Sequence, residues 1–231
     1  MKSLAQLQAV IHYQFNDQKL LETALIHRSS SKNNNYERLE FLGDSVLGLV
    51  ISSHLFQRLD DATEGELSRI RASLVKEEAL ATVARDICLG DYLQLGSGEL
   101  KSGGYRRASI LSDALEALFG AIYLDAGFEQ CEKTILFLYH EYLVTLPSPV
   151  ALKDPKTTLQ EFLQSQRMGL PVYEVTRTEG KSHNQTFTVS CQIEDLDIQT
   201  EGKGSSRKKA EQMAASRALK KAQGQATGSQ K

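Results

Sequence analysis

Three carboxylates interrupt a segment that otherwise has the composition of a buried helix. Glu37, Glu40 and Asp44 stand at i, i+3 and i+7, a spacing that places them on one face of a helix. The segment then continues through mostly apolar residues to Ile51. Acidic side chains are rarely buried unless they are paired or bind a metal. This face is therefore either an ordinary solvated or ion-paired surface, or part of a cation site.

A second segment repeats the pattern. Residues 110–128 are almost all apolar, yet they include Asp113 and Glu116, one helical turn apart. The segment contains no Lys or Arg that could pair with them. A solvated face remains the alternative for either segment alone, but the two together favour a cation site. Two such helices packed together would present carboxylate oxygens to a hard divalent cation.

The bulk properties are those of an ordinary globular protein. At 231 residues the chain can form one large domain or two smaller ones. No apolar run approaches the length of a membrane span, and the first residues lack a signal-peptide pattern. Cys88, Cys131 and Cys191 are too far apart for a Cys-x-x-Cys metal site. We therefore expect a cytoplasmic protein with reduced thiols and no membrane partner.

The charge is unevenly distributed along the chain. The net charge is −2, but residues 1–153 hold 15 Lys and Arg against 20 Asp and Glu, a balance of −5. Residues 154–222 hold 11 against 9, a balance of +2. Within them, residues 205–222 carry six basic side chains against the single carboxylate of Glu211. This distribution indicates a catalytic module joined to a module that binds polyanions.

Prolines at positions 147, 149 and 155 mark a boundary between these modules. We expect a catalytic domain over 1–146, a linker over 147–153, a second domain over 154–223 and a polar tail over 224–231.

The pattern before this boundary is helical throughout. Asp17 is a candidate N-cap, and Thr63 with Glu66 has the form of a capping box. The glycine-rich residues 95–107 are typical of an ordered loop. They lack the Gly-Lys-Ser/Thr ending of a nucleotide-binding loop, so we expect no nucleotide cofactor. The expected helices, in chain order, are 17–26, 37–51, 63–75, 77–88, one within the segment 110–128 and one over 128–146, with Gly127 as the stop signal between the last two.

The period changes after the boundary. A helix is expected over 157–167 and another over 205–222, with alternating, β-branched strands between them at 172–178, 186–193 and 196–201. The predicted fold is an all-α domain followed by a small α+β domain of order α-β-β-β-α.

Four stretches resemble the ribonuclease III family, in the family's order. They are ERLEFLGDSVL at 37–47, TEGELSRIRASLV at 63–75, LSDALEALFGAIYLD at 111–125, and the part from DPKTTLQEFLQ to GSSRKKAEQMAA, which is similar to a double-stranded-RNA-binding domain. The resemblance covers about residues 4–222 and is closest to the two-domain bacterial members.

This resemblance implies a homodimeric, Mg²⁺-dependent endonuclease that cuts both strands of duplex RNA, with Mn²⁺ as a substitute metal. It implies products with a 5′-phosphate, a 3′-hydroxyl and a short 3′ overhang. It also suggests that the substrates are ribosomal RNA precursors and some messenger and transfer RNA precursors.

The resemblance also assigns site residues. The family's catalytic metal cluster is matched by Glu40, Asp44, Asp113 and Glu116. We expect Glu40, Asp113 and Glu116 to be direct ligands, with Glu116 also catalytic. Asp44 is expected either to bind metal through water or to orient the nucleophile. Auxiliary catalytic positions are matched by Glu37 and Glu64, and an aromatic of the dimer interface by Phe41.

The second domain also has a physical interpretation. A-form RNA is recognised mainly by shape, through its shallow minor groove and its phosphates. Backbone amides and cations at a helix start suit phosphates, although a basic helix start is often only a solvated face. The expected RNA-binding residues are Thr157, Gln160 and Glu161 on the first helix, His183 and Asn184 in the turn between strands, and Ser205, Ser206, Lys208 and Lys209 at the last helix.

Two alternatives to the nuclease remain at this point. The first is an RNA-binding protein without catalysis, which the four intact acidic positions disfavour. The second is a metal-dependent phosphohydrolase for small substrates, which the basic residues of the second domain disfavour.

Overall fold

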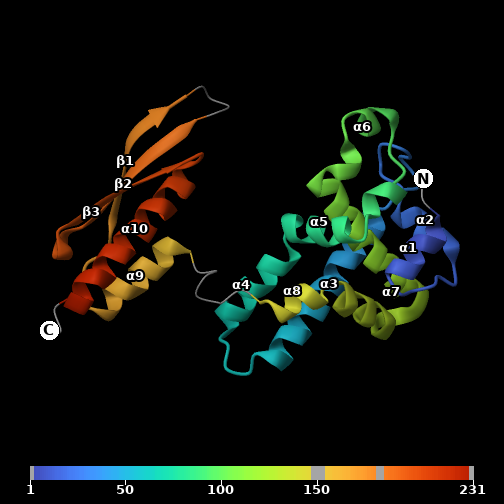
Figure 1. The fold of residues 1–231 in the computed structure, drawn as a ribbon, viewed down its shortest axis with the longest axis horizontal. Helices are drawn as coiled ribbons and strands as arrows, with labels where there is room; N and C mark the ends of the chain where they lie inside the picture. The colour runs from blue at the N-terminus through green and yellow to red at the C-terminus, as the bar shows by residue number, and fades with distance from the viewer. Residues whose placement is uncertain (1–2, 147–153, 181–184, 229–231) are drawn as a thin grey trace. The chain divides into compact units, whose positions relative to one another are not determined.

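The computed structural model describes residues 3–146, 154–180 and 185–228. The chain divides into two compact units, an N-terminal unit over 1–152 and a C-terminal unit over 153–231 (Figure 1). The expected linker at 147–153 lies outside the described residues.

The described part of the N-terminal unit is helical, as the sequence predicts. Its elements are α1 (Leu4–Val10), α2 (Gln18–Ala24), α3 (Glu37–Arg58), α4 (Glu64–Val75), α5 (Glu77–Asp86), η1 (Leu89–Tyr92), α6 (Ser97–Lys101), η2 (Gly104–Arg106), α7 (Ala108–Leu138) and α8 (His140–Val144).

Local side-chain bonds fix where two of these helices begin. The Asp17 carboxylate accepts from the amide of Lys19 at 3.0 Å and caps α2. Thr63 and Glu66 form a reciprocal capping box at the start of α4, with the Thr63 amide donating to Glu66 Oε2 at 2.9 Å. Both caps were expected from the sequence, because capping needs only a short local pattern.

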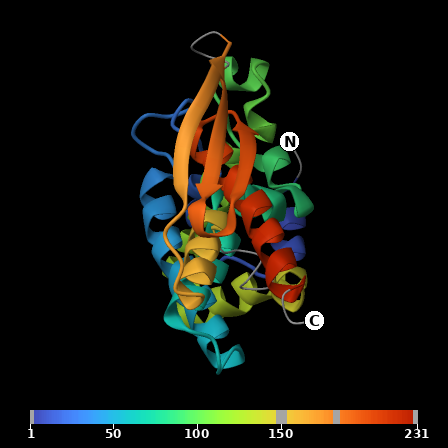
Figure 2. The same cartoon turned by 90° about the vertical axis from the view of Figure 1, so that its left-hand side faces the viewer.

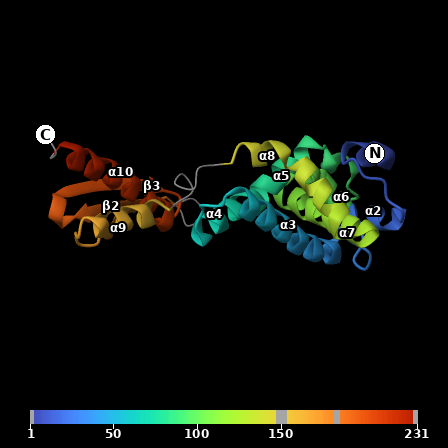
Figure 3. The same ribbon diagram turned by 90° about the horizontal axis from the view of Figure 1, so that it is seen from below.

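The core of the unit is built around α3 and α7, which lie side by side (Figures 1 and 3). The two backbones approach closely: a Cβ on Gly120 of α7 would lie 2.2 Å from the carbonyl oxygen of Leu39 on α3. Of the described helices, α3 alone is long and apolar enough, by length and composition, to cross a membrane. The sequence alone does not identify this helix as a candidate span, because polar residues interrupt its apolar runs. Its contacts with α7 make it a core helix of this unit.

Several boundaries differ from the sequence expectation. The ordered loop that we expected over residues 95–107 contains two short helices, α6 and η2. One helical turn offers too few periodic positions to be recognised from a pattern. Gly127 leaves the helical conformation inside α7, with φ 80° and ψ −177°, as its predicted role as a break requires. The helix after it ends at Leu138, and the short α8 follows.

The C-terminal unit is a three-stranded antiparallel sheet with two helices. Its elements are α9 (Pro155–Ser165), β1 (Val172–Glu179), β2 (Thr186–Ile193), η3 (Glu194–Leu196), β3 (Ile198–Gly204) and α10 (Arg207–Gly228). The strand order is β1-β2-β3, so β3 is an edge strand (Figure 2). Leu159 and Leu163 of α9 and Ala214 and Ala218 of α10 pack into a core with the sheet.

Several elements of this unit have different bounds from those predicted, most clearly β3 and α10. The strand β3 begins at Ile198 rather than at residue 196, because Glu194–Leu196 forms a 3-10 turn and Asp197 adopts a left-handed φ of 50°. The helix α10 continues to Gly228, beyond the expected end at Ala222. The α-β-β-β-α order is confirmed.

Candidate functional site

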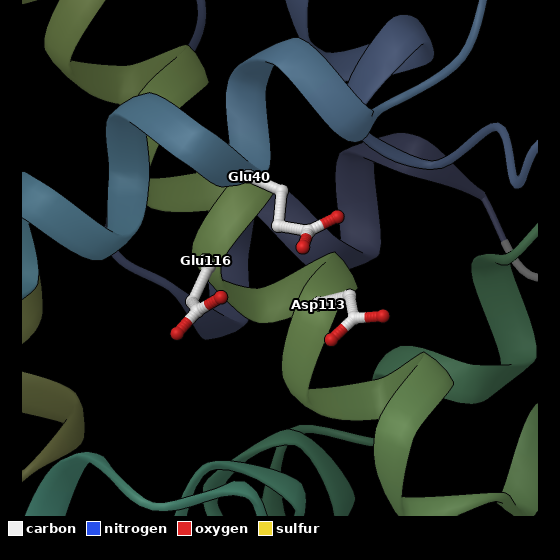
Figure 4. Close-up of side chains that lie close together, drawn as sticks. All are labelled: Glu40, Asp113 and Glu116. Carbon is white, nitrogen blue, oxygen red and sulfur yellow. The ribbon is translucent and has the colours of Figure 1, made fainter.

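Three carboxylates from two helices converge in the N-terminal unit. Glu40 comes from α3, and Asp113 and Glu116 come from α7. Each offers one oxygen, and these oxygens all lie within 4.8 Å of one another. Figure 4 shows the side chains reaching into a common space between the two ribbons. All three side chains are half-buried. The two acidic helix faces that the sequence shows within apolar segments therefore face each other.

The packing of α3 against α7 raises the proton affinity of this cluster. Burial, followed by repulsion from Asp44, Glu40 and Asp113, raises the pKa of Glu116 to about 8. Burial and the carboxylates of Asp113 and Glu37 raise the pKa of Glu40 to about 7, against the opposing charge of Arg28. Burial also raises the pKa of Asp113, although a hydrogen bond from Ser112 opposes it. Repulsion of this kind is relieved when a cation binds between the groups.

The chemistry of these donors fits a hard divalent cation. All three are carboxylate oxygens, the ligand type that Mg²⁺ and Mn²⁺ prefer over nitrogen or sulfur. Described His and Cys side chains contribute no ligand atom to the cluster.

A pocket of about 450 Å³ opens beside the cluster and includes Glu40 and Asp113 in its wall. Two arginines also line it, each paired with a peripheral carboxylate. Arg28 Nη1 lies 3.3 Å from Glu37 Oε1, and Arg107 Nη1 lies 2.9 Å from Glu99 Oε2. The wall of the pocket therefore carries both guanidinium and carboxylate groups.

A hydrogen-bonded turn supports the wall that carries Arg28. The amide of Ser29 donates to His27 Nδ1 at 3.1 Å, and the amide of Gly96 donates to Ser29 Oγ at 2.9 Å. The second bond joins residues 67 positions apart in the chain, and no local sequence pattern signals it.

The other predicted residues of this unit are placed in different ways. Asp44 is exposed on α3 and close enough to repel Glu116. Glu37 lies next to the cluster, in the pocket with Arg28. Glu64 is not near the cluster within one chain: it begins α4, accepts from Ser68 Oγ at 2.7 Å and lines a different groove. The spacing of residues along the chain could not distinguish these locations.

That second groove, of about 580 Å³, lies between α3 and α4. It is bordered by an apolar stripe on α3 whose members are exposed: Phe41 by 79%, Leu49 by 57% and Phe56 by 72%. Phe41 continues this stripe beyond the groove itself, at the spacing of one helix face. Large apolar side chains that are exposed together are typical of interaction surfaces.

In the C-terminal unit, the starts of α9 and α10 are tied together. Lys156 Nζ donates to Glu211 Oε2 at 2.7 Å, and Gln212 Nε2 donates to Asp154 Oδ2 at 2.6 Å. The sequence did not predict these cross-helix bonds, because they join residues more than 50 positions apart. They bring two of the predicted RNA-binding segments onto neighbouring helices.

The predicted RNA-binding residues on these two segments are accessible. Ser206 Oγ accepts from the amide of Lys209 at 3.2 Å, which caps the start of α10. His183 and Asn184 lie outside the described residues. The exposed members of the predicted set are Thr157, Gln160, Glu161, Ser205, Lys208 and Lys209.

Comparison with known families divides the chain at the same place as its fold. Residues 17–143 match the family described as ribonuclease-III-like. Residues 155–222 match the double-stranded RNA binding motif.

Individual relatives match nearly the whole chain. "Ribonuclease 3" of Shewanella amazonensis is 54% identical over 95% of this chain and 96% of its own length. "Ribonuclease 3" of Photobacterium profundum is 53% identical over 93% of this chain and 96% of its own length.

Solved structures support the same relationship. The nuclease domain of ribonuclease III from Campylobacter jejuni is 44% identical, with a TM-score of 0.61 over 64% of this chain and all of that one. A second structure of that domain, whose description concerns flexibility in the region of dimer formation, is 45% identical, with a TM-score of 0.59 over 60% of this chain and 97% of that one. Because relatives more than half identical span both units of the fold, the chain belongs to the ribonuclease III family and is a double-stranded-RNA-specific endoribonuclease.

Proposed function

We propose that this enzyme uses Mg²⁺, held by Glu40, Asp113 and Glu116, to cleave both strands of duplex RNA. The products would carry 5′-phosphate and 3′-hydroxyl ends with a short 3′ overhang. The observation that carries the proposal is the convergence of these three carboxylates within 4.8 Å. An anionic cluster of this kind cannot receive an RNA phosphate until its charge is neutralised. Mn²⁺ would substitute, because it accepts the same oxygen ligands.

The residues of the site have different roles in this proposal. Bound Mg²⁺ would supply a polarised phosphoryl oxygen and an activated water. Glu116 has the most strongly raised pKa of the cluster, because it is buried beside three other carboxylates, and a bound cation would relieve this repulsion. Asp44 is exposed at the edge of the cluster, where it is available to orient the attacking water. Glu37 is held by Arg28 and limits how far that guanidinium reaches toward the phosphate.

RNA recognition is assigned to the C-terminal unit, over residues 154–223, and catalysis to residues 1–146. Thr157, Gln160 and Glu161 on α9 face the minor groove in this proposal, with His183 and Asn184 in the next one. Ser205, Ser206, Lys208 and Lys209 at the start of α10 meet the phosphates between them. The bonds between the starts of α9 and α10 support this assignment, because they hold two of the contact segments in a fixed relation.

We also propose a homodimer that forms through the apolar stripe of α3. Phe41, Leu49 and Phe56 leave large apolar surfaces exposed, and the related Campylobacter jejuni domain has a region involved in dimer formation. Glu64 lines the groove beside this stripe. Its auxiliary catalytic role would therefore depend on the dimer interface. A dimer supplies two sites, one for each strand of the duplex.

The natural substrates in this proposal are ribosomal RNA precursors, with some messenger and transfer RNA precursors, processed in the cytoplasm. End-group analysis of the cleaved RNA tests the chemistry. We expect ligatable 5′-phosphates and 3′-hydroxyls on both strands. Products with 3′-phosphates or 2′,3′-cyclic phosphates would contradict the proposal, because in both the 5′ oxygen, and not the 3′ oxygen, is the leaving group.

A further inference from the structure

A second basic surface lies on the C-terminal unit, away from the starts of α9 and α10. Arg217, Lys220 and Lys221, in the second half of α10, line an open groove of about 710 Å³. The opposite wall is β3 at residues 199–201. Figure 1 shows this half of α10 at the end of the unit opposite to the end of β1 and the start of β2. The RNA-binding segments described above do not include these residues.

The three cations outnumber the single carboxylate that lines the groove, that of Glu201 on β3. The only acidic residue of α10 is Glu211, and it already pairs with Lys156 and Arg207. Among the ion pairs of the described residues, none involves Arg217, Lys220 or Lys221. Three positive charges within one and a half helical turns repel one another, so a site of this composition gains from a bound anion.

The side chains are also oriented across the groove. Arg217 Nη1 donates to the carbonyl oxygen of Glu201 at 2.7 Å, and Lys221 Nζ donates to the carbonyl oxygen of Gln199 at 3.3 Å. Each bond uses one donor, which leaves four on the guanidinium and two on the ammonium. The β3 edge therefore holds two cations in place while most of their donors stay available.

The groove lies on the same side of α10 as part of the basic start of that helix. Lys209 and Lys220 are eleven residues apart, which places them on the same side of the helix and roughly 16 Å apart along it. An RNA phosphate chain that leaves the start of α10 can follow this side to the groove. The open shape and the volume suit an extended backbone rather than a single small anion.

We propose that the groove between α10 and β3 is a second phosphodiester-binding site. It takes RNA outside the duplex segment held at the helix starts, either a single-stranded flank or a longer stem. This inference rests on the RNA-binding role of the C-terminal unit. Its effect is to favour long or flanked substrates over a minimal duplex, without changing the cleavage chemistry.

The test uses the full chain with Arg217, Lys220 and Lys221 all replaced by Gln. A charge-matched control replaces Lys19, Arg85 and Lys133, which are exposed on the N-terminal unit. Affinity is measured against salt concentration, in EDTA to prevent cleavage, for three RNAs. These are a duplex of about 16 base pairs, which spans one binding domain, the same duplex with single-stranded flanks, and a longer duplex.

We expect the groove variant to bind the short duplex within twofold of the parent and the flanked or longer RNA about tenfold more weakly. For the affected RNA, the slope of log binding constant against log salt concentration should become shallower by roughly 2 to 3. This is about one unit for each lost phosphate contact. Whichever of the two larger RNAs is affected identifies the flank or the stem as the occupant. Lys220→Gln alone, at a side chain with no hydrogen bond among those of the described residues, should lower the slope by about 1.

Two results would overturn the proposal. Parent-like affinity for all three RNAs would show that the groove does not bind phosphate. If larger assemblies also appeared, the cations would instead protect the β3 edge from strand pairing. An equal loss on all three RNAs would place these residues in the primary binding surface. Cleavage of the short duplex by the parent in Mg²⁺ is scored separately, so failure of the groove and failure of the nuclease assignment are distinguishable.

Discussion

Gly43 on α3 lies directly against the backbone of Glu116 on α7: a Cβ on Gly43 would come within 1.8 Å of the Glu116 carbonyl oxygen. The contact is between backbones, so no side-chain rotation can relieve it. Because Glu40 is one helical turn before Gly43, the same contact sets the distance between Glu40 and the two carboxylates of α7. The geometry of the carboxylate cluster therefore depends on a residue that has no functional group.

Gly43→Ala should separate α3 from α7 and disrupt the cluster. We expect a loss of about 3 kcal/mol in unfolding free energy, typical of forced overpacking in a core, and Mg²⁺ binding at least about tenfold weaker. Thermal unfolding and calorimetric Mg²⁺ titration measure the two effects. Gly98→Ala is the control, because a Cβ there meets nothing within 4 Å. Parent-like Mg²⁺ affinity in Gly43→Ala would show that the helix spacing does not determine the site.

Glu116→Gln should stabilise the metal-free enzyme at high pH only. The pKa of Glu116 is about 8 in the folded protein and near 4.5 in the unfolded chain. The folded state binds this proton more tightly than the unfolded chain does. The contribution of the protonated Glu116 side chain to stability is therefore complete below about pH 4.5 and is lost as the pH rises through about 8.

With EDTA present, the variant and the parent should therefore unfold at similar temperatures at pH 5. At pH 9 the variant should unfold roughly 2–4 °C higher, equivalent to about 1 kcal/mol after allowance for solvent screening. The charged groups that face Glu116 are Asp44, Glu40 and Asp113, and none of them is altered. A difference that is equal at both pH values would contradict the assigned electrostatics.

Mg²⁺ should stabilise the parent against heat and lose this effect when a ligand is removed. At one hundred times its dissociation constant, a bound ion contributes about 2.7 kcal/mol. We expect this shift in the unfolding of the parent at pH 8 and its absence in Asp113→Asn. Glu129→Gln removes an exposed carboxylate of the same helix outside the cluster and should respond like the parent. An unchanged response in Asp113→Asn would mean that Mg²⁺ binds elsewhere.

Phe56→Glu should convert the proposed dimer into a monomer. Phe56 is 72% exposed in the single chain, so a charge there costs little in folding but opposes an apolar interface. Light scattering should give the mass of one chain for this variant and of two for the parent. Leu124→Glu, at an exposed apolar residue on α7 outside the stripe, should remain dimeric. Dissociation caused by Leu124→Glu instead would move the interface to α7.

The sequence predicts those features of the site that depend on local spacing. The separation of Asp113 and Glu116 places both on one side of α7, and the caps at Asp17 and Thr63 follow from patterns of a few residues. The apolar composition of α3 predicts that more of its side chains are buried than the structure shows. The helix is apolar on nearly every side in sequence, yet Phe41 and its neighbours on that stripe are exposed.

The features that the sequence does not predict are long-range. Spacing shows which face of α4 carries Glu64, but not that this face lines the α3–α4 groove instead of the carboxylate cluster. The bond from the Gly96 amide to Ser29 Oγ joins residues 67 positions apart and depends on the packed core. The Arg28–Glu37 pair crosses an irregular turn without helical periodicity.

Incubation of a long, perfect RNA duplex with the parent and with Glu116→Gln, in Mg²⁺ or in Ca²⁺, tests the central claim most directly. We expect the parent to cut both strands in Mg²⁺ but not in Ca²⁺, which prefers more ligands and longer bonds than Mg²⁺. Glu116→Gln should bind the duplex with parent affinity and cut neither strand. Binding without cleavage by the parent in Mg²⁺, or undiminished cleavage by Glu116→Gln, would contradict the account.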